Sequence, residues 1–189
     1  MAAPGRADES NGIRGRLLRM SDAVAWVEAR FAGAIVAAIL GLLLANVVSR
    51  AFGRPLIWTD ELAVYLMVLG AFAGASLGLA RRQHIAVTLI SDAMGERIST
   101  ALSRVVDTIL LGLFALLAWM LWNWFDPLGV LSAESLQAYS RESFNFLYQE
   151  PTTTLGVRKV WFWLILPVFC LTGLVHVFAR FGAVSERAQ

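Results

Sequence analysis

The chain has 189 residues, of which 58% are hydrophobic and 16% are charged, with a formal net charge of +2 and a mean hydropathy of +0.63. Ordinary soluble domains carry about 25% charged residues, so this composition excludes a typical soluble protein. A single cysteine, Cys170, excludes an internal disulfide and a cysteine metal cluster.

The chain begins with a polar segment rich in Gly, Ala and Arg, and we expect residues 1–20 to form a flexible tail. A charge-free run of 19 residues follows at 31–49, between Arg30 and Arg50. A helix that crosses a bilayer needs about 20 mostly apolar residues, so this run predicts a first membrane span. It is longer than the apolar region of a cleaved signal peptide, which has about 7–15 residues.

Three further charge-free runs cover 62–80, 108–125 and 160–179. Backbone polar groups in lipid must be satisfied within the segment, so each run is expected to be helical. The sequence therefore predicts an all-α integral membrane protein with four transmembrane helices. Its membrane domain would cover 21–182, followed by a short tail at 183–189.

The basic residues are distributed unevenly over the segments between these runs. Eleven of the 16 fall in the two terminal tails and the second connection, and five fall in the first and third connections. The positive-inside rule places both termini in the cytoplasm. An aromatic belt is expected near the outer ends of the third and fourth spans, where five tryptophans gather. These are Trp119, Trp122, Trp124, Trp161 and Trp163.

The second span opens on two adjacent acids, Asp60 and Glu61. Acids in a first turn complement the positive end of the helix dipole, and Thr59 or Asp60 could cap free backbone N–H groups. An ion pair with Arg50 or Arg54 is also expected. One cap would suffice, however, so the second acid needs a further explanation.

The same span carries Gly70, Gly74 and Gly78 at intervals of four residues. Small residues at this spacing let membrane helices approach closely. We expect this face to pack against protein, either inside the bundle or on another subunit. A leucine at Gly74 should then disturb the packing.

The second connection, residues 81–107, has apolar residues mostly at steps of three and four. This pattern predicts an amphipathic helical segment in the membrane interface between helices two and three, although its second half could instead extend helix three. Four basic residues would face anionic lipid headgroups. They are Arg81, Arg82, Arg97 and Arg104. The third connection, 126–159, is long, and its apolar pattern predicts a surface helix before Pro151.

Candidate catalytic and metal-binding residues are few. His84 and His176 fall at similar depth near the inner ends of two spans, and could in principle hold a haem iron. The spans show no inverted repeat and few ionisable residues, which argues against a stand-alone transporter, our third hypothesis. We expect no enzymatic activity, cofactor or metal site in this chain. A partner in a larger assembly is favoured, with a membrane haem or redox protein as the alternative.

Residues 58–87 carry a motif that resembles the small membrane subunit, of the DctQ type, of tripartite ATP-independent periplasmic (TRAP) transporters. The shared elements are Trp58, Asp60-Glu61-Leu62-Ala63, Tyr65, Gly70-Ala71, Arg82, His84-Ile85 and Val87. The chain departs from the family pattern at two positions. Val64 stands where the family commonly has arginine, and Thr88 where it commonly has aspartate.

The resemblance implies a scaffold subunit in the bacterial inner membrane. It would brace a large multi-span subunit that carries substrate and sodium, and a periplasmic solute-binding protein would deliver the solute, usually an organic acid. Transport would be driven by the ion gradient. The motif residues would then serve assembly. They are Trp58, Asp60, Glu61, Tyr65, Gly70, Arg82 and His84. We predict that Glu61 is needed for assembly or stability rather than for chemistry.

Overall fold

A computed structural model describes residues 5–81 and 96–184 of the chain. Within these ranges the chain is helical, apart from connections and one isolated β-bridge between Pro151 and Arg158. The helices are α1 (Gly5–Ala51), α2 (Ile57–Ala80), α4 (Glu96–Phe125), α5 (Pro127–Ser132), α6 (Leu136–Ser143), α7 (Val160–Trp163) and α8 (Ile165–Val184). The predicted all-α fold is confirmed.

Four helical segments are long and apolar enough to cross a membrane, and each contains one of the charge-free runs. The fourth segment is divided into α7 and α8 at Leu164. Pro167 explains the division, because it has no N–H to donate and its ring crowds the carbonyl of Trp163, four residues earlier. The chain is therefore a multi-pass membrane protein.

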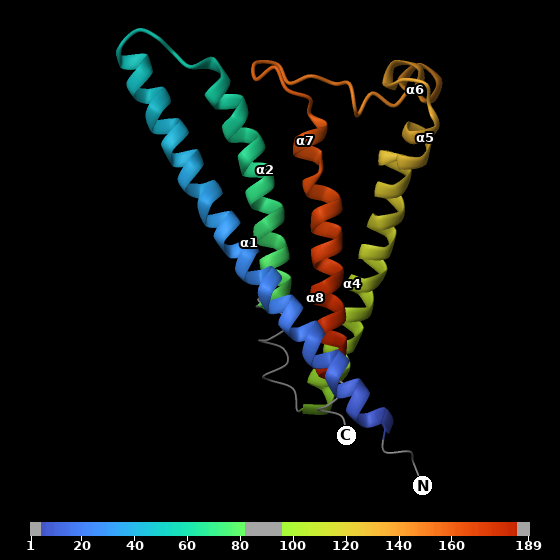
Figure 1. The fold of residues 1–189 in the computed structure, drawn as a ribbon. Helices are drawn as coiled ribbons and strands as arrows, with labels where there is room; N and C mark the ends of the chain where they lie inside the picture. Colours follow the sequence, from blue (N-terminus) through green and yellow to red (C-terminus); the bar gives the residue numbers. More distant parts are fainter. Residues whose placement is uncertain (1–4, 82–95, 185–189) are drawn as a thin grey trace.

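The start of α1 and the end of α8 lie at one end of the molecule, here called the terminal end, and the connections 52–56 and 126–159 lie at the other, the loop end (Figure 1). α8 packs against α1, α2 and α4, and the main neighbour of α4 is α8. The helices converge near the terminal end and spread apart toward the loop end (Figure 1). α8 is thus the central helix of the bundle.

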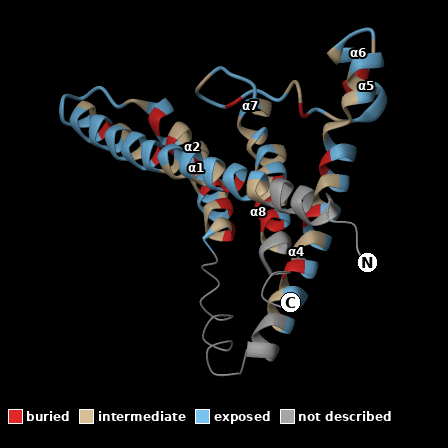
Figure 2. Cartoon of the chain, turned by 60° about the horizontal axis from the view of Figure 1, so that its bottom comes forward, coloured by how far each residue is buried: buried red, intermediate tan, exposed pale blue. Residues whose placement is uncertain are grey.

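The apolar core lies along α8 and the face of α4 that meets it. Its buried members are Leu79, Phe114, Leu121, Cys170 and Val177. Most other large apolar side chains of α1 and α4 are exposed (Figure 2), and only 11% of the most apolar stretch of α1 is buried within the chain. Lipid solvates such side chains as well as protein does, so the fold does not depend on burying them.

Two expectations about the terminal end are corrected. α1 begins at Gly5, so the predicted flexible tail of residues 1–20 is helical from residue 5 onward. No proline follows Pro4 before the membrane span, so nothing in the sequence breaks the helix there. In the second connection, residues 96–107 extend α4, which was the alternative to an interfacial helix. Residues 82–95, the first part of the predicted interfacial segment, lie outside the described residues.

The tight contact between α4 and α8 gives the first testable prediction. A Cβ added at Gly173 would lie 2.2 Å from Cζ of Phe114, whose side chain is 2% exposed. Gly173→Ala must displace that ring, so we expect a loss of about 1–3 kcal/mol in stability. Thermal unfolding of the purified chain in detergent measures it.

Gly112→Ala is the matched control, because a Cβ there would meet no atom within 4 Å. It should leave the unfolding temperature unchanged or raise it slightly, since Ala favours a helix over Gly by about 1 kcal/mol. Equal unfolding temperatures for the two variants would contradict this account of the contact.

Candidate functional site

The acids at the start of α2 connect this helix to two different parts of the chain. Asp60 accepts a hydrogen bond from Nδ2 of Asn46 at 2.8 Å and one from Arg50 at 3.2 Å, both on α1. The Arg50 pair is exposed, and such pairs contribute little, about 0–1 kcal/mol. Asn46 is 5% exposed, so its bond to Asp60 is the one that fixes α2 beside α1. The predicted ion pair with Arg50 is confirmed.

Glu61 contacts the long connection at the loop end. Its carboxylate accepts hydrogen bonds from the backbone N–H of Thr153 at 2.8 Å and of Thr154 at 2.6 Å, and from the Thr154 hydroxyl at 2.6 Å. Hydrogen bonds to an ionised acceptor are stronger than those between neutral groups. Glu61 therefore holds a segment about 90 residues away in sequence against the start of α2.

The capping role expected of Thr59 or Asp60 is wrong. The cap position of α2 is Leu56, and no side chain caps it. α2 starts at Ile57, before the acids, so Thr59 already lies inside the first turn. Its buried hydroxyl donates back to the Leu56 carbonyl at 2.6 Å.

Further along α2, two motif residues pack on other helices. The Tyr65 ring stacks on Phe162 of α7, with centroids 4.1 Å apart and planes 10° from parallel. Gly70 faces Ile35 of α1, where an added Cβ would lie 3.2 Å from Cγ2. Trp58 is 39% exposed at the loop end. Four motif residues therefore each join α2 to another part of the chain, namely Asp60, Glu61, Tyr65 and Gly70.

Gly74 and Gly78 differ from Gly70. A Cβ at either position would meet nothing within 4 Å in the described chain. Within the described chain, close packing therefore involves Gly70 and does not involve Gly74 or Gly78. Contact of their face with another subunit stays a prediction.

Among the basic residues expected at the membrane surface, Arg81 and Arg104 are exposed near the terminal end. Arg97 falls in α4. Arg82 and His84 lie outside the described residues, so their predicted roles are not tested.

A buried polar group near the terminal end was missed by the sequence reasoning. His176 of α8 is fully buried, with Nδ1 2.8 Å from the Ser21 hydroxyl and Nε2 3.2 Å from a carboxylate oxygen of Glu28. A neutral ring with its proton on Nε2 satisfies both contacts, because Ser21 then donates to Nδ1 and Nε2–H donates to Glu28. With both ring nitrogens engaged, the structure lends no support to a haem site.

Two further polar contacts join α8 to its other neighbours. The Thr172 hydroxyl lies 2.9 Å from that of Ser76 on α2. Arg180 forms an ion pair with Asp107 of α4, where the side chains are 12% and 2% exposed. Thr172, His176 and Arg180 are four residues apart, so they form one stripe along α8 that contacts all three other long helices. This spacing was visible in the sequence, but the partners on the other helices were not.

The long connection at the loop end is tied to α4. The Tyr139 hydroxyl donates to Asp126 at 3.1 Å, and the Tyr148 hydroxyl donates to the Phe125 carbonyl at 2.6 Å. Burial raises the pKa of both tyrosines. The predicted surface helix is present as α6, but Tyr139 is only 4% exposed, so this helix is packed and not merely a surface feature.

Comparison with known proteins places these contacts in context. A sequence model of the family described as "Tripartite ATP-independent periplasmic transporters, DctQ component" matches residues 39–185. The chain belongs to the DctQ family. Over 67 residues it is also 36% identical to the sialic acid TRAP transporter permease protein SiaT of Haemophilus influenzae (strain 86-028NP). That match covers 35% of this chain and 11% of the relative, so the chain spans only a small part of that protein's length.

Glu61 provides a test of the contacts that the DctQ motif makes. Glu61→Gln removes the negative charge that three donors share, so the amides of Thr153 and Thr154 should exchange with solvent several-fold faster. Hydrogen exchange of the purified subunit measures both amides. Glu142→Gln, at an exposed acid of α6, is the matched control and should leave them unchanged. Unaltered exchange in the Glu61 variant would show that the carboxylate does not hold the connection.

The two kinds of glycine on α2 give a second test. Gly70→Leu should lower the unfolding temperature of the isolated subunit, because Ile35 leaves no room for a branched side chain. Gly74→Leu should lower it much less, because Gly74 is exposed and a Cβ added there would have no neighbour within 4 Å. A similar loss of stability in both variants would contradict this distinction.

Proposed function

We propose that this DctQ-family chain is the small scaffold subunit of a TRAP transporter, acting with a large multi-span membrane subunit and a periplasmic solute-binding protein. The observation that carries the proposal is that Asp60, Glu61, Tyr65 and Gly70 of the motif each fix α2 against another element. A motif devoted to internal contacts suits a subunit that supplies a fixed frame.

The geometry explains how such a frame resists movement. The stripe on α8 joins α1, α2 and α4 near the terminal end, and Glu61 and Asp60 join α2 to its neighbours at the loop end. Both ends of α2 are therefore fixed. A partner whose transport domain moves across the membrane needs such a stationary neighbour.

The cargo and the orientation belong to the same proposal. We assign to the transporter an organic acid or similar solute, imported against its gradient with sodium bound by the large subunit, and no cofactor or catalysis to this subunit. The similarity to the sialic acid TRAP transporter permease of Haemophilus influenzae supports an acidic solute. The distribution of basic residues supports cytoplasmic termini in a bacterial inner membrane.

A pull-down tests the assembly. The subunit is tagged after Gln189, extracted from native membranes in mild detergent, and the eluate is identified by mass spectrometry. We expect one much larger multi-span protein in near-equal amount. Reconstituted vesicles should then take up the solute only with both membrane subunits, the solute-binding protein and a sodium gradient. Recovery of this chain alone would contradict the scaffold proposal, and uptake by this chain alone would favour a stand-alone transporter.

A further inference from the structure

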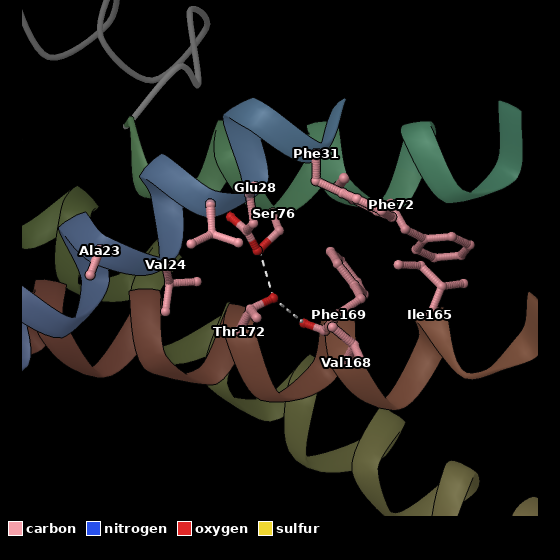
Figure 3. A pocket seen from close by; sticks show the side chains of 12 residues that line it. Ala23, Val24, Glu28, Phe31, Phe72, Ser76, Ile165, Val168, Phe169 and Thr172 are labelled. Carbon is pink, nitrogen blue, oxygen red and sulfur yellow. Dashed lines mark hydrogen bonds between the residues drawn. The ribbon is translucent and has the colours of Figure 1, made fainter. Parts of the chain in front are cut away.

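A groove of about 470 Å³ lies between α1, α2 and α8 (Figure 3). Glu28, Ser76 and Thr172 lie together near the middle of the lining, with Ala23 and Val24 on one side of them and Phe72, Phe169 and Ile165 on the other (Figure 3). Val27 and Val168, which also line the groove, are 57% and 50% exposed. The groove is therefore open at the surface of the subunit.

Glu28 is the only acid that lines this groove, and the residue is 8% exposed. His176 engages one of its carboxylate oxygens, Oε2, at 3.2 Å. Among the described residues, no hydrogen bond reaches the other oxygen, Oε1. The groove thus contains one acceptor that no described residue satisfies.

The depth of the groove decides what can satisfy that acceptor. Ser76 is five residues from Arg81 and Thr172 is eight residues from Arg180, both at the terminal end. At a rise of about 1.5 Å per residue, Ser76 and Thr172 lie roughly 7–12 Å inward from these basic residues along their helices. That depth is inside the hydrocarbon of a bilayer, where ionisable groups pair with protein groups.

A lipid does not meet this requirement, because acyl chains carry no hydrogen-bond donor and the headgroups lie nearer the surface. A membrane helix does, since a long basic side chain on it can reach the carboxylate. The groove also has small residues, Ala23 and Ala73, in its wall, which allow close approach. The negative charge of Glu28 favours an occupant that carries a positive charge at this position.

We propose that this groove receives a transmembrane helix of the large TRAP subunit, which places a lysine or arginine against Glu28. This inference rests on the proposed function and identifies the surface through which the two membrane subunits would associate. Behind the groove, His176 and Ser21 hold the carboxylate in position from the side of α8 and α1. This subunit therefore holds the carboxylate in position, and the partner donates a hydrogen bond to its other oxygen.

Site-specific photo-crosslinking identifies the occupant. A photoreactive amino acid is placed at Val27 or Val168 in the tagged full-length subunit, and native membranes are irradiated before extraction. Val36 of α1, 66% exposed and outside the groove lining, is the control position. We expect both groove positions to form adducts with the large subunit more strongly than Val36. Adducts with lipid alone, from a subunit that still co-purifies the large subunit, would overturn the groove while leaving the scaffold role intact.

The charge is tested with two variants of one buried pair. Glu28→Gln removes the negative charge from the groove, whereas His176→Gln keeps it and retains a side-chain donor toward Glu28. We expect Glu28→Gln to lower recovery of the large subunit about tenfold and His176→Gln to leave it within about twofold. Unfolding temperatures of the two isolated variants show whether either has lost its fold. Equal recovery of the large subunit with both variants would overturn the pairing. Failure of the unaltered subunit to recover any partner would instead overturn the proposed function.

Discussion

The polar stripe on α8 is the constraint on which the arrangement of the bundle depends. Thr172, His176 and Arg180 each contact a different helix, namely α2, α1 and α4. In lipid the apolar side chains gain little by meeting each other, so apolar pattern alone does not choose helix neighbours. A buried polar group without a partner is costly there, so these three contacts specify which helix lies where. They also explain why the bundle converges near the terminal end.

The loop end is organised by a different principle. The helices spread apart there (Figure 1), and the contacts that span the gap come from α2 and the long connection. Asp60 reaches back to α1, while Glu61 accepts three hydrogen bonds from Thr153 and Thr154. Two of these three bonds come from backbone amides, so they do not depend on the side chains of the connection. The contacts of Asp60, Glu61, Tyr65 and Gly70 thus position α2 between its neighbours.

The four membrane spans were predictable because apolar length reflects the thickness of the bilayer directly. The contacts between spans were not, because a single sequence records which residues are polar but not which of them meet. Glu28 is an example, since the structure buries it against His176, a residue 148 positions away in the sequence. The capping role failed for a simpler reason, since α2 starts before the acids, at Ile57. Element boundaries of this kind are set by local backbone geometry rather than by hydropathy.

Glu28 links the two properties that a scaffold subunit needs. It fixes α1 to α8 through His176, and in the groove it presents an oxygen to which no described residue donates a hydrogen bond. In the proposed complex, a basic side chain of the large subunit would pair with that oxygen and thereby stabilise the contact between α1 and α8. Anything that binds only the folded form stabilises it by mass action. Assembly and internal order would then be coupled through one carboxylate, and the bundle would be most firmly held when its partner is in place.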